Sequence, residues 1–71
     1  MTIEICDESI KLGQALKLSG MAESGTDAKE RILSGEVKVN GKVELHRGRK
    51  LIEGDEIELD NEVIVVQRKK S

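Results

Sequence analysis

The sequence predicts an α+β fold in which two short helices pack on a small, mainly antiparallel sheet of about four to five strands. Three observations lead to this prediction. Apolar and polar residues alternate in short segments near both ends of the chain, as in strands. Between these segments, apolar residues recur at helical spacing. Gly-containing pairs, including Asn-Gly and Gly-Asp, punctuate the segments as turns do.

The 71 residues are predicted to form a single domain over 1–67, followed by a basic flexible tail at 68–71. The chain has no Phe, Trp or Tyr, so an aliphatic core is expected. A single cysteine, Cys6, excludes an intrachain disulfide, and no apolar run is long enough for a membrane span. We therefore expect a cytoplasmic protein without a membrane partner, in which Cys6 is buried as a small apolar side chain.

The first elements are a strand and a helix. Residues 2–5, TIEI, alternate polar and apolar side chains as a short strand does. Asp7 or Ser9 is the candidate cap of the following helix, and Gly20 is expected to end it. The apolar residues of this helix recur at helical spacing, and they are Leu12, Ala15 and Leu16.

The second helix is predicted over residues 24–35. Ser24 and Asp27 have the spacing of a capping box at its beginning. Ala28 and Ile32 are four residues apart and share one helical face, which we expect to be buried.

The second half of the chain reads as strands. VKVNGKV is a hairpin with its first valines inward, and Asn-Gly at 40–41 favours a two-residue type I′ turn. We expect Val43 and Leu45 to continue the inward pattern. After a turn at 53–55, EIEL predicts a strand, and a last strand is expected at 63–66 on the edge of the sheet.

Positive charge gathers in one segment of a chain whose net charge is −2. Residues 29–50 hold seven basic and three acidic residues, a balance of +4, whereas the remainder holds five basic and eleven acidic residues, a balance of −6. A ligand within a Debye length of about 8–10 Å responds to the local charge. Arg47 and Arg49 carry forked donors suited to phosphate oxygens, on either side of Gly48. We interpret the segment as a phosphate-binding surface, with a solvated loop that only aids solubility as the alternative.

From Lys11 to Leu59 the chain resembles the RNA-binding domain first known from small-ribosomal-subunit protein four, also called the alpha-L motif. The residues that carry this resemblance occur in the order Leu12, Leu16, Ser24, Ala28, Lys29, Gly35, Val37, Val39, Asn40, Gly41, Gly54, Asp55 and Ile57. Three further pieces are similar to the small stand-alone bacterial proteins of the YbcJ/YaaA group: LG at 12–13, ESG at 23–25 and RGRKL at 47–51.

The resemblance implies binding of structured RNA by the second helix and by the hairpin and loop at 38–50. Ribosomal RNA, a ribosome assembly intermediate and transfer RNA are the implied targets, with ribosomal particles as implied partners. Many relatives carry Arg directly after the capping Ser, where this chain has Gly25, so one phosphate contact is absent. Carried over by position, the RNA-binding residues are Lys29, Lys38, Asn40, Lys42, Arg47, Arg49 and Lys50.

The residue types restrict how RNA is recognised. Without Phe, Tyr or Trp, base stacking of the kind used by RNP-motif sheets is unavailable, and arginine planes are a partial substitute. This leaves recognition of shape, phosphates and 2′-hydroxyls in folded or double-helical RNA. These residue types do not distinguish RNA from DNA, so the preference for RNA comes from the resemblance.

No catalytic or metal-binding constellation is found in the sequence. The single histidine, His46, does not complete a Ser-His-Asp triad, and with Cys6 it offers too few metal ligands. We therefore expect no enzyme, no cofactor and no small-molecule substrate. The alternative function is a protein-interaction module that binds a basic partner through the acidic surface at 53–62.

Overall fold

The computed structural model describes residues 1–69. Within them the chain forms two helices, α1 (Leu12–Leu18) and α2 (Gly25–Leu33). The strands are β1 (Thr2–Ile5), β2 (Ile10–Lys11), β3 (Lys38–Val39), β4 (Lys42–Val43), β5 (Lys50–Leu51), β6 (Glu56–Leu59) and β7 (Glu62–Arg68). No helix in this part of the chain is long and apolar enough to cross a membrane.

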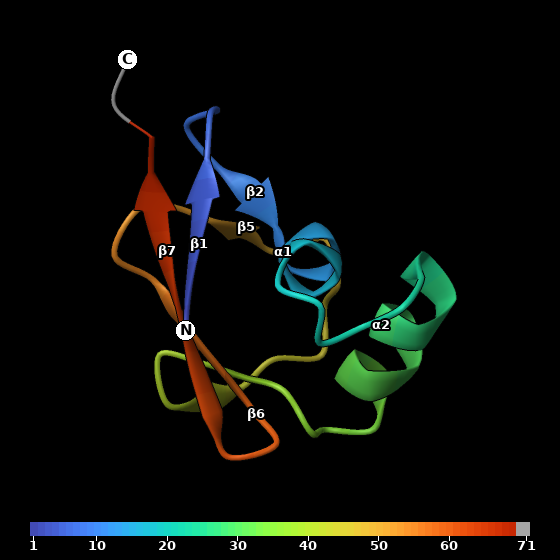
Figure 1. The fold of residues 1–71 in the computed structure, drawn as a ribbon. Coiled ribbons are helices and arrows are strands. Elements are labelled where there is room, and N and C mark those ends of the chain that lie inside the picture. The colour runs from blue at the N-terminus through green and yellow to red at the C-terminus, as the bar shows by residue number, and fades with distance from the viewer. Residues whose placement is uncertain (70–71) are drawn as a thin grey trace.

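Five strands form the main sheet in the order β1-β7-β6-β3-β4, and β2 pairs with β5 as a separate two-stranded ribbon. Only β1 and β7 run parallel; the other pairs among these strands are antiparallel. Both helices lie to one side of β1 and β7 in Figure 1. The predicted α+β architecture is confirmed. The edge position predicted for residues 63–66 is wrong, because β1 pairs alongside β7 and covers it.

One aliphatic core joins the sheet to the helices. Strands β1 and β6 alternate exposed and buried residues, so each presents one apolar side to the helices. The described part of the chain buries no polar or charged residue. The core contains Ile3, Ile5, Leu12, Ala15, Leu16, Ala22, Ala28, Ile32, Val37, Val39, Leu51, Ile57, Leu59, Ile64 and Val66. Each large aliphatic side chain contributes about 1.5–3 kcal/mol when it is fully buried.

Helix α1 begins without the side-chain cap that the sequence predicted from Asp7 or Ser9. Its N-cap residue is Lys11, whose side chain makes no capping hydrogen bond. The first two helical N–H groups donate instead to the backbone carbonyls of Arg49 and Arg47, at 2.8 and 3.0 Å. Pairing of β2 with β5 brings these carbonyls to the helix start. The helix is therefore capped by a distant loop, and that loop is held against α1.

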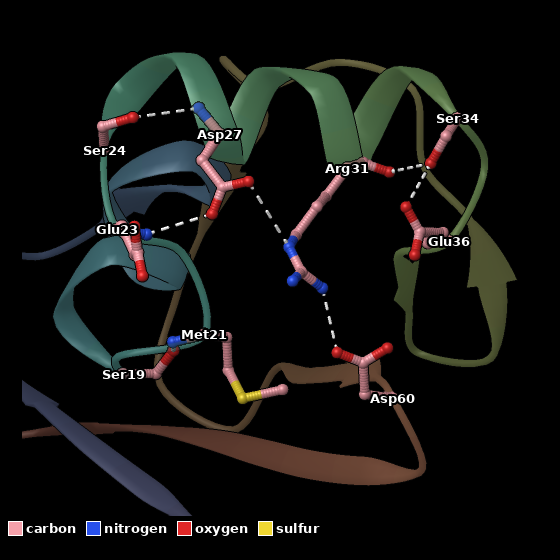
Figure 2. A network of polar contacts seen from close by, with 9 residues as sticks. All are labelled: Ser19, Met21, Glu23, Ser24, Asp27, Arg31, Ser34, Glu36 and Asp60. Atoms are coloured by element: carbon pink, nitrogen blue, oxygen red, sulfur yellow. Dashed lines mark hydrogen bonds and ion pairs between the residues drawn. The ribbon is translucent and has the colours of Figure 1, made fainter.

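Helix α2 begins as predicted, with the Ser24 hydroxyl accepting from the Asp27 N–H at 3.1 Å (Figure 2). The Asp27 carboxylate accepts from the N–H of Glu23, one residue before the N-cap, also at 3.1 Å. Further along the helix, Arg31 pairs with Asp60 at 2.9 Å in the turn between β6 and β7. This hydrogen bond raises the pKa of Arg31 above its ordinary value. Arg31 therefore anchors α2 to the sheet.

The hairpin between β3 and β4 has the predicted turn but not the predicted inward face beyond it. Residues 40 and 41 have φ values of 52° and 85°, in the left-handed region that a type I′ turn needs. The register pairs Lys38 with Val43, so both side chains share the solvent side. Val43 and Leu45 are 53% and 50% exposed, and the prediction that they face inward is wrong. Across a two-residue turn, the inward side chains of the second strand are those paired with inward side chains of the first, so Glu44 points inward in place of Val43 and Leu45.

Two predictions near the ends of the chain are also corrected. Cys6 is exposed, because it follows the inward-facing Ile5 by one position. Strand β7 extends to Arg68, and the Lys69 N–H donates to the Ile5 carbonyl at 2.8 Å, so the tail does not begin at residue 68. The rest of the predicted tail, residues 70–71, lies outside the described residues.

Candidate nucleic-acid interface

A groove of about 760 Å³ lies between α2 and the loop at 44–49. Three predicted site residues meet in it: Lys29 from α2, and Arg47 and Arg49 from the loop. Its apolar lining comes from Ile32, Leu33 and Leu45. We call this the helix–loop groove. It joins cations from two segments that are about 20 residues apart in the chain.

A second groove of about 280 Å³ lies on the other side of Arg47 and Gly48. Its lining includes Lys11 and Lys17 at the two ends of α1, together with Gln14, Gly13 and Gly25. We call it the α1 groove. The charge pattern along the chain does not indicate Lys11 and Lys17, because both precede the basic segment and lie in the acidic remainder of the sequence. Gly25 stands where the resemblance implies an arginine, and these two lysines supply positive charge beside it.

Lys50 extends the same surface through the small ribbon. It pairs directly with Lys11 across β2 and β5, so two ammonium groups share one side of the ribbon. Neither lysine forms a salt bridge within residues 1–69. Like charges in facing positions destabilise a strand pair, and a bound polyanion would relieve this. We define the basic face as Lys11, Lys17, Lys29, Arg47, Arg49 and Lys50.

Glu44 is the one acidic residue among those that line either groove. Its Oε1 accepts from Arg49 at 2.8 Å, and its Oε2 accepts from the N–H groups of Leu45 and His46 at 3.1 and 3.3 Å. The His46 ring nitrogen Nδ1 lies 3.0 Å from the same Oε2. The hydrogen bond from Arg49, and then that from His46, lower the pKa of Glu44 to about 2. Glu44 therefore holds the loop and orients Arg49.

Replacing Glu44 with Gln is expected to change the pH dependence of stability. A carboxylate with a lowered pKa stabilises the fold fully above its ordinary pKa of 4.5, and this contribution is lost as the pH falls to about 2. The melting temperature of the wild type should therefore fall more steeply than that of Glu44→Gln over this interval, and the two should converge near its lower end. Thermal melts at several pH values measure this. Parallel curves would show that Glu44 does not form these contacts in solution.

The structure brings together four of the seven predicted site residues and places the other three on the hairpin. Asn40 uses its side chain within the fold: Nδ2 donates to Asp55 at 3.2 Å, and Oδ1 accepts from the Glu56 N–H at 3.0 Å. Lys38 faces Glu58 across the strand pair, in a hollow that also contains acidic residues. Lys42 is exposed on β4. These three residues line neither groove, and contact between them and RNA stays a prediction.

A family model described as "S4 domain" matches residues 3–67. This chain belongs to the S4 domain family. The match spans both helices and the strands of the main sheet, so it covers the elements that build the basic face. The resemblance to the RNA-binding domain of small-ribosomal-subunit protein four is confirmed at the level of the family.

Individual relatives of this S4 domain are bacterial proteins of similar length. A Bacillus subtilis (strain 168) protein named "Probable ribosome maturation protein RlbA" is 45% identical over 58 residues, which are 82% of each chain. An Escherichia coli (strain K12) protein named "Putative RNA-binding protein YbcJ" is 40% identical over 55 residues, covering 78% of this chain and 69% of the relative. A Shigella flexneri protein named "Uncharacterized protein YbcJ" matches to the same extent.

Proposed function

We propose that this S4 domain protein binds structured RNA without catalysis, and that the basic face makes the contact. The observation that carries the proposal is the convergence of six cations from β2, α1, α2 and the 44–50 segment in a chain whose net charge is −2. The single carboxylate in the two grooves is already neutralised by Arg49. The acidic remainder of the chain repels phosphate and restricts RNA to this side.

The names of the relatives support RNA as the ligand rather than DNA, since one is named for RNA binding and another for ribosome maturation. We propose ribosomal RNA or a ribosome assembly intermediate as the first target class, with transfer RNA as the second. The basic face presents lysines and arginines on two helices and a loop held by Glu44, which suits phosphate oxygens of a folded RNA. A cytoplasmic location follows from such targets and is part of the proposal.

The structure gives less support to the alternative, a protein-interaction module using the acidic surface at 53–62. Three of its carboxylates are used within the fold, and the first is that of Glu53, which accepts from the Arg68 N–H at 3.2 Å. Asp55 accepts from the Ile52 N–H at 2.8 Å, and Asp60 pairs with Arg31 at 2.9 Å. Glu56 and Glu58 are exposed and free to meet solvent or a partner.

Crosslinking in cells, followed by sequencing of the bound RNA, tests the proposal and identifies the target. The comparison is between the wild type and Lys29→Glu/Arg47→Glu, because neither of these residues forms a salt bridge within residues 1–69. We expect enrichment of one structured RNA by the wild type and its loss in the variant. Equal recovery from both proteins would contradict the proposal. A protein partner that survives nuclease treatment in both would favour the acidic surface.

A further inference from the structure

We propose that the helix–loop groove receives one unpaired nucleotide of the RNA, with its base against Leu33 and Leu45 and its phosphate between Lys29 and Arg47. This inference rests on the proposed function and adds a preference: RNA that offers a bulged or looped-out base should bind better than a continuous double helix.

The apolar lining of the groove is the first reason. Leu33 and Leu45 are 59% and 50% exposed, and both line this groove, with Ile32 fully buried beneath. Single exposed leucines are ordinary, but two in one cationic groove form an apolar surface where phosphates alone would not need one. The backbone of a continuous RNA helix presents charged and hydroxylated groups, whereas an unstacked base presents an apolar face.

The cations on the rim are the second reason. Lys29 and Arg47 form no salt bridge within residues 1–69, so both are available to a phosphate. Arg49 differs, since Glu44 holds its guanidinium at 2.8 Å while its side chain stays 44% exposed. A guanidinium fixed in this way offers a flat surface on which a base can stack. The groove therefore combines phosphate donors, a planar cation and two leucines.

The size of the groove is the third reason. Its volume of about 760 Å³ lies within the range of about 300–1,000 Å³ found for small-molecule sites, which is enough for one nucleotide. Proteins that read RNA sequence mostly contact unpaired bases in loops and bulges, often stacking them on aromatic rings. This chain has no Phe, Tyr or Trp, so the leucines and Arg49, together with the exposed imidazole of His46 in the same lining, would take the place of such a ring.

Two RNA hairpins test the inference. They share a stem of about 16 base pairs, the length that a small double-strand-binding domain spans, and differ only in one unpaired adenosine in the stem. We expect the wild type to bind the bulged hairpin about fivefold more tightly, the effect of covering on the order of 40 Å² of apolar surface. Leu33→Ala/Leu45→Ala should lose this preference and keep its affinity for the paired hairpin. The matched control is Ile52→Ala/Val63→Ala, since both residues are exposed outside the groove.

The outcomes separate this inference from the proposed function. Equal wild-type affinity for both hairpins, weakened by Lys29→Glu/Arg47→Glu, would overturn the inference and leave the proposed function intact. Wild-type binding to neither hairpin would overturn both. A preference that persists in Leu33→Ala/Leu45→Ala would show that the unpaired base does not bind in this groove, and would overturn the inference.

A fluorescent base analogue gives a readout that needs no variant. Aminopurine placed at the unpaired position is dim while it stacks in RNA and brightens when it leaves the stack. The wild type should brighten it, because the base leaves its neighbours in the stem and no Phe, Tyr or Trp is present to stack on it. Unchanged fluorescence on binding would show that the base does not enter the groove.

Discussion

Replacing Lys29 and Arg47 with glutamate is expected to lower RNA affinity about 100-fold. Each residue supplies a charge-assisted hydrogen bond to phosphate worth about 1.5 kcal/mol, and together these give about 3 kcal/mol, or two factors of ten. Both side chains are without an ion-pair partner in residues 1–69, so the melting temperature should change little. Titration of a labelled hairpin and a thermal melt of each protein measure the two effects.

The control for this variant is Arg68→Glu/Lys69→Glu. It also changes the net charge from −2 to −6, but its residues lie beside Glu4 and Glu53, away from both grooves of the basic face.

The salt dependence of RNA binding adds a second criterion. For about four to six phosphate contacts, log affinity should fall against log salt concentration with a slope near −3 to −5. In the Lys29→Glu/Arg47→Glu variant this slope should be shallower by about two units. Equal weakening of RNA binding by both variants would show that only the net charge matters, and would contradict the proposal that the basic face contacts the RNA.

Replacing Ile32 with Ala is expected to have the largest effect on stability. Ile32 is a fully buried core residue on the inner side of α2. Truncation of such a residue to Ala lowers the free energy of unfolding by about 3 kcal/mol. A 71-residue domain has on the order of 4–10 kcal/mol in total, so the loss is a large part of it. The melting temperature should fall by roughly 12–24 °C.

The adjacent Leu33→Ala is the matched control, on the same helix and with a side chain of the same size. Leu33 is 59% exposed, so its truncation should change stability by no more than about 0.5 kcal/mol. Chemical denaturation of both variants measures the difference. Equal losses of stability would mean that Leu33 packs in the core. Leu33 would then not form part of the apolar lining of the helix–loop groove.

Elements defined by neighbouring residues were predictable from the sequence. The start of α2 depends on the Ser24 hydroxyl and the N–H three residues later, and the hairpin turn depends on left-handed conformations that Asn40 and Gly41 adopt readily. Alternation in TIEI and EIEL identified the buried sides of β1 and β6 for the same reason. The inward position of Glu44 was also predictable. Counting the alternation of side chains through a two-residue turn places Val43 on the solvent side and Glu44 on the inner side.

The candidate site was predictable only in part. The charge count over residues 29–50 identified Lys29, Arg47, Arg49 and Lys50, but it also included Arg31, which pairs with Asp60 in the β6–β7 turn. No local pattern shows that pairing, because the two residues are 29 positions apart.

By itself, the sequence determined the two helices, the turns and the apolar sides of β1 and β6, since these depend on interactions within a few residues along the chain. The tertiary structure alone decided which distant segments meet. It placed β1 beside β7, carried Lys11 and Lys17 to the basic segment, and set the carbonyls of the 47–49 loop on the first N–H groups of α1. Such contacts form only when the whole core closes, because the hydrophobic burial that favours them is not directional and spacing along the chain does not specify them.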